Sequence, residues 1–371
     1  IRSVSRTAVS KVAHALPTER AYAAGPEMGS NPVRFASAMS SGGTVEAALR
    51  SGSATSVHTS ELSAARVQVY NSYFDKNYTA KNIADKASLA SLRESRAQHY
   101  HASPVCKSFS AATNLKTAKP EDLVIAQSVA RDIREVRPPT ISIENVPLYA
   151  GFVRRKTGWV QDEKQVTALY KMITKELDAG GYNWDVVIAN AADYGGAQNR
   201  TRILVRAMLP ELGELPPVPK PTGGNDWYTL LKGEIDMAKK IPIAQVTGPK
   251  VELRRIRTMV ESWQSGKRGV AALDPTKPIF TTGQMAGPGP AYARNAGMPG
   301  PTLTVSGKAR IILPGSKGLD NAMVVDVTPV MYNKYMGLPD SYGLHLAKGR
   351  GSLAKEILGD GVHGAVTKNF I

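Results

Sequence analysis

Segments of strand character alternate with segments of helical character from residue 31 to residue 208, and this alternation constrains the fold most. The expected strands cover residues 33–37, 55–59, 99–103, 140–143, 184–189 and 203–208. The expected helices begin near residues 44 and 63 or cover 121–136 and 161–178, the last being the clearest because its apolar residues share one face. Repeated strand–helix units predict an α/β fold, with helices on both faces of a mostly parallel sheet.

The alternation lapses near residue 210, where proline and glycine become frequent. Residues 210–224 contain five prolines and two adjacent glycines, which indicates a linker. We therefore expect four parts, namely a basic N-terminal extension, an α/β domain, a smaller, irregular and basic domain, and a segment that completes the α/β domain. In the same order, they cover residues 1–30, 31–214, 215–322 and 323–371. The extension has the composition of an organelle transit peptide or of an arm that contacts DNA phosphates.

The charge balance of the chain is strongly basic. Its 47 lysines and arginines exceed its 31 acidic residues, so the formal net charge is +16. A surplus this large predicts a polyanionic partner, most simply nucleic acid, although a basic surface without a partner is the alternative. No apolar run reaches the ~18 residues that cross a membrane. The single cysteine fits a reducing, cytoplasmic compartment, with organelle targeting left open.

That single cysteine, Cys106, follows the expected strand at 99–103. Pro104 ends the strand, and Ser108, Ser110 and Asn114 follow in an expected loop. A lone intracellular cysteine is usually a small buried hydrophobe. A thiol at the exit of a strand, however, lies where open α/β sheets bind ligands, and a nearby positive charge can make it a nucleophile.

The first expected strand and helix are joined by Ser40-Ser41-Gly42-Gly43. A turn with two glycines at a helix N-terminus suits a nucleotide-like cofactor, and Glu61, after the second strand, is placed to bind ribose hydroxyls. Many turns of this kind only connect two elements, so the turn alone does not decide the function.

Six motifs in order resemble those of the DNA cytosine-5 methyltransferase family. They are His101 to Ser110 around the cysteine, Glu144-Asn145-Val146, Gln198-Asn-Arg-Thr-Arg202, Pro301-Thr-Leu-Thr304, Thr328 to Tyr342 and Gly359-Asp-Gly-Val362. Each is a weak pattern by itself, but their order and spacing make the resemblance specific over residues 33–371. The resemblance implies a Rossmann-like methyltransferase sheet with a second, smaller and irregular target-recognition domain at 215–322.

The resemblance also implies the chemistry. Cys106 would add to C6 of a flipped-out cytosine in double-stranded DNA, which turns C5 into a nucleophile for the methyl group of S-adenosylmethionine. Glu144 would supply a proton or a strong hydrogen bond to N3. Arg202 would contact the O2 side of the base, and Arg200 would hold the loop or a phosphate. We expect both arginines to lie on one strand and to point the same way.

Other residues are assigned by matching the family motifs one by one. Those implied for S-adenosylmethionine are Gly42, Gly43, Glu61, Leu62, Asn82, Ile83, Pro104, Asp360 and Val362. Those implied for nucleic acid are Lys107, Ser110 and Thr302. Arg254, Arg255 and Arg257 match no motif, but they lie on an expected helix at 251–264 of the basic second domain and are expected to contact phosphates or bases. The protein is expected to act as a monomer on DNA.

Several residues depart from the family pattern. Val105 and Lys107 replace the proline and glutamine that usually flank the nucleophile, and Ala38-Met39-Ser40 replaces Phe-x-Gly in the cofactor turn. Asn82 and Asp360 replace an aspartate and an asparagine. The alternatives are therefore a tRNA cytosine-5 methyltransferase, a catalytically weak DNA-binding relative, and an enzyme that transfers another one-carbon group to a pyrimidine.

Overall fold

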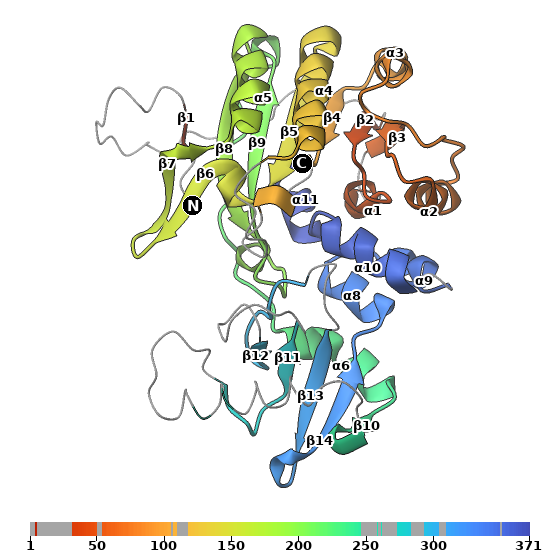
Figure 1. Cartoon of the computed structure of the whole chain (residues 1–371), viewed down its shortest axis with the longest axis vertical. Coiled ribbons are helices and arrows are strands. Elements are labelled where there is room, and N and C mark those ends of the chain that lie inside the picture. Colours follow the sequence, from red (N-terminus) through yellow and green to blue (C-terminus); the bar gives the residue numbers. More distant parts are fainter. Residues whose placement is uncertain are drawn as a thin grey trace.

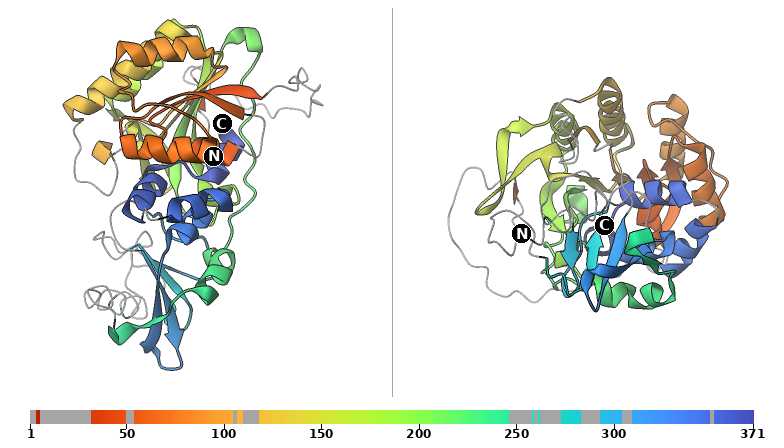
Figure 2. Two further views of the ribbon diagram at one scale, coloured as in Figure 1. Left: turned by 90° about the vertical axis from the view of Figure 1, so that its right-hand side faces the viewer. Right: turned by 60° about the horizontal axis from the view of Figure 1, so that its bottom comes forward.

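A computed structural model gives the arrangement of most of the chain. It describes residues 4–5, 32–49, 54–104, 107–109, 118–245, 258, 261, 273–282, 293–303, 309–348 and 351–371. Within these residues the chain forms two bodies, each built around its own sheet (Figure 1). Figure 1 and the left-hand view of Figure 2 show the molecule from two directions at right angles. In both, the smaller sheet lies toward one end of the molecule and the larger sheet toward the other.

The larger sheet has seven strands among the described residues, in the order β1-β8-β9-β5-β4-β2-β3. They are β1 (Val4–Ser5), β2 (Val33–Ala38), β3 (Ala54–Ser60), β4 (His99–Ala102), β5 (Thr140–Asn145), β8 (Asn183–Asn190) and β9 (Thr201–Met208). Strands β3, β2, β4 and β5 are parallel, whereas β9 is antiparallel to both of its neighbours. The expected α/β fold with a mostly parallel sheet is confirmed, with β9 and the edge strand β1 as exceptions.

Helices cover both faces of this sheet, because its strands bury side chains on each side. On one face α3 (Lys86–Ser95), α4 (Pro120–Val136) and α5 (Ala168–Ala179) pack with apolar residues such as Ile133, Ile141 and Ile173. On the other face α1 (Thr44–Leu49) and α11 (Gly364–Phe370) pack on Phe35 and Leu204. The last helix of the chain therefore shares a core with strand β2, near the beginning of the α/β domain.

The predicted helix at 161–178 is wrong in its first third. Residues Gly158–Val166 form strand β7, which pairs antiparallel with β6 (Ala150–Arg155). Thr167 then caps α5, since its hydroxyl accepts a hydrogen bond of 3.1 Å from the backbone N–H of Tyr170. The apolar stripe therefore belongs to two elements, with Val166 paired to Ala150 in the hairpin.

The second sheet is regular where the sequence predicted an irregular region. In the described part of residues 241–326 it has the order β10-β14-β13-β11-β12, and the pairs are antiparallel. Its strands are β10 (Ile241–Pro242), β11 (Ile279–Thr281), β12 (Ala293–Asn295), β13 (Arg310–Gly315) and β14 (Gly318–Asp326). Short strands between Gly- and Pro-rich connections hide the period of two that marks a strand. Strand β14 crosses the boundary expected at residue 322.

The two bodies share a core made by helices from distant parts of the chain. This core contains Trp227 of α6 (Trp227–Met237), Phe280 of β11, Tyr335 of α8 (Pro329–Tyr335), Tyr342 of α9 (Asp340–Ala347) and Ile357 of α10 (Gly351–Asp360). Helix α2 (Ala64–Phe74) packs against α9 and α10 from the side of the larger sheet. None of the described helices is both long and apolar enough to span a bilayer.

Candidate active site

The carboxyl ends of β2, β4 and β5 lie side by side and form the centre of the candidate site. The chain passes from β2 to β3 on one side of β2 and then returns to β4 on its other side. The connections therefore diverge between β2 and β4, which opens a crevice at the ends of these strands. The segments that leave these ends are the turn after Ala38, the loop after Ala102 and the Glu144-Asn145 dipeptide.

The segment that precedes the expected nucleophile is tethered to β5. The Asn145 side chain donates a hydrogen bond of 3.0 Å from Nδ2 to the carbonyl of Pro104, and its Oδ1 accepts one of 2.9 Å from the N–H of Val146. Cys106 lies outside the described residues and follows Pro104 by two positions in the sequence. No role for Asn145 was predicted from the sequence, although its amide can hold two backbone groups at once.

The segment that follows the cysteine is also held. A short 3-10 turn covers Lys107–Phe109, and the Ser108 hydroxyl donates to Asp122 of α4 at 2.6 Å. Phe109 is buried with its ring edge-on to Tyr149, at a centroid distance of 5.7 Å. The expected nucleophile therefore lies between two anchored points of the chain.

Glu144 and Arg202 form an ion pair at the end of β5. The Arg202 Nε lies 2.8 Å from Glu144 Oε1, and both side chains are largely buried. Arg202 also donates to the carbonyl of Thr201 at 2.8 Å. A buried carboxylate is stable only beside such a partner, so the pair holds two charged groups at the mouth of the crevice.

Arg200 does not share the environment of Arg202. Strand β9 begins at Thr201, so the expectation that both arginines lie on one strand is wrong. Arg200 is only 2% exposed, and its guanidinium donates to three backbone carbonyls. These belong to Leu303 (3.3 Å), Gly359 (3.1 Å) and Gly361 (2.7 Å). Arg200 therefore connects the strand to the second body and to the C-terminal motif.

Thr302 lies beside the motif at residues 198–202. Its hydroxyl donates to the carbonyl of Asn199, and the N–H of Asn199 donates to the carbonyl of Gly300 at 2.9 Å. A bridge between Gln198 and Gly300 continues the contact. The loop of the second body is therefore fixed against the segment that carries Arg200.

The turn between β2 and α1 has an unusual backbone. Met39, Ser41, Gly42 and Gly43 have φ angles of 57°, 46°, 79° and 93°. A side chain on Gly43 would place its Cβ 2.6 Å from Phe74 and 2.7 Å from Tyr70, so only glycine fits between α1 and α2. The Tyr342 hydroxyl donates to the Gly42 carbonyl at 2.8 Å. The turn is thus held from both sides.

Glu61 is tied to the same turn. One carboxylate oxygen accepts from the N–H of Ser41 at 3.1 Å and the other from the N–H of Ser63 at 3.0 Å. Each oxygen keeps a second lone pair, which can still accept from a hydroxyl. The neighbouring Leu62 is 71% exposed, so its apolar side chain is accessible to a ligand.

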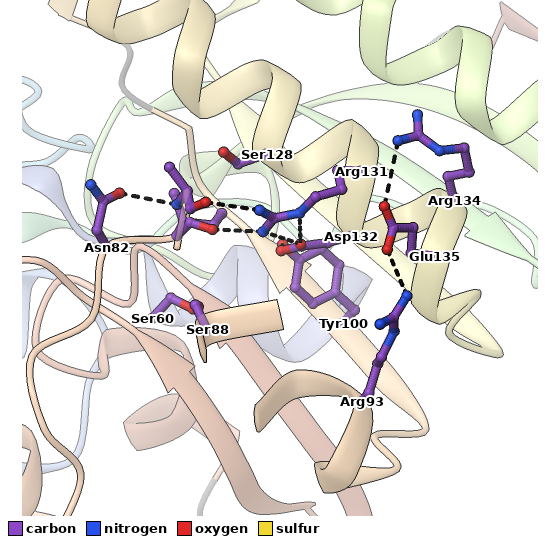
Figure 3. Close-up of polar contacts among 12 residues, drawn as sticks. Ser60, Asn82, Ser88, Arg93, Tyr100, Ser128, Arg131, Asp132, Arg134 and Glu135 are labelled. Carbon is purple, nitrogen blue, oxygen red and sulfur yellow. Dashed lines mark hydrogen bonds and ion pairs between the residues drawn. The ribbon is translucent and has the colours of Figure 1, made fainter. Parts of the chain in front are cut away.

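Asn82 lies on a loop that Arg131 of α4 holds in place (Figure 3). Arg131 donates to the carbonyl of Ile83 at 2.7 Å and to that of Ala84 at 3.0 Å, and it pairs with Asp132. The Asn82 side chain accepts from the N–H of Ala84 at 3.0 Å. Asn82 therefore shapes the loop through its Oδ1.

The C-terminal motif closes the opposite wall. Asp360 pairs with Arg66 of α2 at 2.7 Å, and Arg66 also donates to the Ser41 hydroxyl at 3.3 Å. The N–H of Val362 donates to Thr44 at 3.3 Å. The end of the chain is thereby joined to the turn at its beginning.

The turn after β2 and the C-terminal motif enclose a narrow crevice lined by Met39, Ser40, Glu46, Ser103, Asp360 and Val362, among others. Glu61, Leu62, Asn82 and Ile83 are not part of its lining. Its free volume is about 10 Å³, close to that of one water molecule, so a larger ligand must widen it. The buried Ser40 Oγ and Glu46 Oε2 have no hydrogen-bond partner among the described residues. Buried polar atoms of this kind are rare and fit a site built for a polar ligand.

Comparison with known proteins identifies the chain. A model of the family described as C-5 cytosine-specific DNA methylase matches residues 33–370. The chain belongs to this family. The Type II methyltransferase M.FnuDI of Fusobacterium nucleatum is 28% identical over 131 residues. That match covers 35% of this chain and 35% of the relative, so it spans about a third of the relative's length.

Solved structures agree on the fold. The Entamoeba histolytica methyltransferase EhMeth matches with a TM-score of 0.57 and 15% identity, over 91% of this chain and 96% of its own. The S. pombe Dnmt2 methyltransferase matches with a TM-score of 0.56 and 15% identity, over the same shares. Together with the family model, these matches confirm the family, the α/β methyltransferase fold, and S-adenosylmethionine as the donor that the family uses.

One buried group of this chain was not predicted from the sequence. Glu46 of α1 is 6% exposed and accepts hydrogen bonds from Ser37 and, at 3.4 Å, from Tyr70. Burial raises the pKa of Glu46 to about 7, so near neutral pH about half of the molecules carry a proton there. A glutamate on an otherwise apolar helix face was the available signal.

Several predicted nucleic-acid contacts lie outside the described residues. They are the side chain of Lys107 and the whole of Ser110, Arg254, Arg255 and Arg257. Of the expected helix at 251–264, only residues 258 and 261 are described, both as helical. These contacts remain predictions of the sequence.

Proposed function

We propose that this protein transfers the methyl group of S-adenosylmethionine to C5 of a flipped-out cytosine in double-stranded DNA, acting as a monomer. The observation that carries the proposal is the arrangement at the end of β5. Glu144 faces Arg202 at 2.8 Å, and the next residue, Asn145, tethers the carbonyl of Pro104 at 3.0 Å, two residues before Cys106. This arrangement suits a base bound between a carboxyl group, a guanidinium and a thiol.

The proposed reaction begins with addition of the Cys106 thiolate to C6 of cytosine. The electron pair of the C5–C6 double bond then makes C5 nucleophilic. S-adenosylmethionine, when bound, supplies an electrophilic methyl group to C5. A base, which the described residues do not identify, then removes the C5 proton, the double bond re-forms and the C6–S bond breaks.

Glu144 and Arg202 act on opposite edges of the base in this proposal. As the base enters, Arg202 turns from the carboxyl group to the cytosine O2, where it stabilises charge that the addition places on the ring. Glu144, released from the ion pair, takes up a proton and donates it in a hydrogen bond to N3, while its other oxygen accepts from the exocyclic amine. The existing contact therefore holds both groups in place and keeps their charges balanced until the base arrives.

Arg200, Thr302 and the C-terminal motif position these groups. Arg200 holds the carbonyls of Gly359 and Gly361, which precede and follow Asp360 of the donor crevice, and also that of Leu303 beside Thr302. One buried guanidinium thus connects the proposed donor site to the loop of the second body. The second body supplies the surface that grips DNA, which agrees with a net charge of +16.

The test is mass spectrometry of nucleosides after incubation of duplex DNA, and separately of tRNA, with the protein and S-adenosylmethionine. We expect 5-methylcytosine from DNA with the wild type and none with Cys106→Ser, which changes one atom. Methylation of tRNA alone would replace DNA by RNA in the proposal. Absence of product from both substrates would overturn it in favour of a binding role.

A further inference from the structure

A continuous chain of hydrogen bonds crosses one face of the larger sheet and ends at the donor crevice. His99 lies between Thr140 (2.9 Å from Nδ1) and Ser142 (2.7 Å from Nε2). His101 lies between Ser142 (2.8 Å from Nδ1) and Ser103 (2.9 Å from Nε2). The residues alternate along β4 and β5, so all of them project from the same face.

The imidazole rings of His99 and His101, the two in this series of hydrogen bonds, are neutral. Burial lowers the pKa of His99 to about 4 and that of His101 to about 3, the neighbouring ring adding to the effect on His101. Phe35 stacks on both, with centroid distances of 5.3 Å and 6.3 Å. Each ring therefore carries one proton, and each acts as a donor at one nitrogen and an acceptor at the other.

The hydrogen bond at Thr140, the end of the series away from the crevice, fixes the direction of every other hydrogen bond in it. The Thr140 hydroxyl donates to the carbonyl of Gln98 at 2.9 Å, so it can only accept from His99. His99 must then carry its proton on Nδ1 and accept at Nε2 from Ser142. Ser142 has one proton, which that bond uses, so it accepts from His101 Nδ1.

The same argument fixes Ser103. His101, protonated on Nδ1, accepts at Nε2, so the Ser103 hydroxyl donates its proton to that nitrogen. Ser103 Oγ then presents only lone pairs to the crevice. A ligand atom that contacts it must be a donor.

The charges around Ser103 indicate which kind of hydrogen-bond donor the ligand presents to it. Asp360 and Glu46 line the same crevice, and none of the described residues that line it is a lysine or an arginine. Arg66 pairs with Asp360 from outside this lining. An acceptor beside carboxyl groups suits a positively charged N–H group. We infer that Ser103 Oγ accepts a hydrogen bond from the α-ammonium group of S-adenosylmethionine, an inference that rests on the proposed site of donor binding. His101 is then a positioning residue.

The first test reads the tautomers directly. Ring ¹⁵N chemical shifts of the protein without ligands should show His99 and His101 as the Nδ1–H form. A His101 ring that carries its proton on Nε2 would free the Ser103 hydroxyl to donate, which overturns the inference.

The second test compares two ligands by calorimetry, S-adenosylmethionine and an analogue without the α-amino group. We expect Ser103→Ala to bind S-adenosylmethionine about tenfold more weakly, as for a hydrogen bond to a charged group, and to bind the analogue as the wild type does. The control is Ser128→Ala on α4, whose hydroxyl donates to the Val124 carbonyl of the same helix (2.8 Å) and which should change neither affinity.

The outcomes separate the inference from the proposed function. If Ser103→Ala loses the same affinity for both ligands, or loses affinity for neither, the role of Ser103 is overturned, whereas the binding of S-adenosylmethionine at this site still stands. A wild type that binds neither ligand overturns the proposed function itself, and the inference with it. His101→Phe, which keeps the stacking on Phe35, should weaken S-adenosylmethionine but cause no further loss when combined with Ser103→Ala.

Discussion

At the scale of single residues, the crevice is surrounded by buried polar groups whose partners are backbone atoms. Asn145, Glu61 and Arg200 each hold main-chain groups of segments distant in sequence. A hydrogen bond from a side chain to a backbone fixes a loop without a second side chain that must itself be ordered. These three side chains therefore help to hold the loops of this chain in one arrangement.

Glu46 gives a prediction for stability against pH. The folded chain keeps its proton up to a pKa of about 7, whereas an exposed glutamate loses it near 4.5. The folded state therefore binds the extra proton between these values, and its stability falls as the pH rises through them. Glu46→Gln cannot ionise, so its stability relative to the wild type should increase by about 3 kcal/mol from pH 4.5 to 7. Urea denaturation of both proteins at several pH values measures this, and a constant difference would contradict it.

Arg200 gives a prediction for stability at constant pH. A lysine cannot reach the three carbonyls that the guanidinium holds, so Arg200→Lys should lower the free energy of unfolding by about 3 kcal/mol. The control is Arg93→Lys, where an exposed arginine pairs with Glu135 and the change should cost less than about 0.5 kcal/mol. Denaturant titrations that gave the two variants the same stability would show that the carbonyl contacts contribute little.

At the scale of secondary structure, the turn between β2 and α1 depends on glycine for two reasons. Gly43 and Gly181 both have positive φ angles, of 93° and 71°, but only Gly43 is packed against other side chains. Each change to alanine should cost about 1 kcal/mol for the backbone, and Gly43→Ala about 1–3 kcal/mol more for the clash with Phe74 and Tyr70. Thermal unfolding of both variants tests this, and equal losses would mean that α2 moves aside freely.

The sequence predicts helices and strands better where the apolar residues follow a single period. Strands β2, β3, β4, β5, β8 and β9 and helix α4 lie where the apolar pattern predicts them, within a few residues. The β6–β7 hairpin was missed because Val166 continues the apolar stripe of α5, so the two periods overlap at one residue. The second sheet was missed because its short strands depend on pairing with segments far away along the chain.

The candidate site was predictable in residue types but not in partners. Motif order placed Glu144, Arg200 and Arg202 together, and the structure brings them to one end of the sheet. Nothing in the sequence indicated that Arg200 binds carbonyls of residues 303, 359 and 361, because such contacts depend on how the C-terminal segment folds back. The histidine chain is similar, since single histidines on strands carry no distinguishing pattern.

At the scale of the whole molecule, four buried histidines predict sensitivity to acid. Burial lowers the pKa of His58 and His99 to about 4 and that of His101 and His363 to about 3. The unfolded chain binds these protons below its own pKa of about 6.5, whereas the folded chain does not. Stability should therefore fall as the pH drops from 6.5 towards 4.

Each histidine contributes up to about 1.4 kcal/mol per pH unit, and proton binding by folded Glu46 offsets one of the four. The melting temperature at constant ionic strength should thus decrease steeply between pH 6 and pH 5. A melting temperature that is flat or rises over this interval would mean that the rings are protonated in the folded state.

The central claim concerns a covalent reaction that the whole molecule arranges, with Cys106 as the nucleophile and cytosine C6 as its target. It is tested most directly with duplex DNA that contains 5-fluorocytosine, S-adenosylmethionine and the protein. After methyl transfer the fluorine at C5 cannot leave as a proton does, so the adduct between Cys106 and C6 should persist. We predict a denaturation-resistant protein–DNA complex, with Cys106 identified as the linked residue by peptide mass spectrometry and no complex with Cys106→Ser. A complex that forms equally with Cys106→Ser, or product without any adduct, would contradict the account.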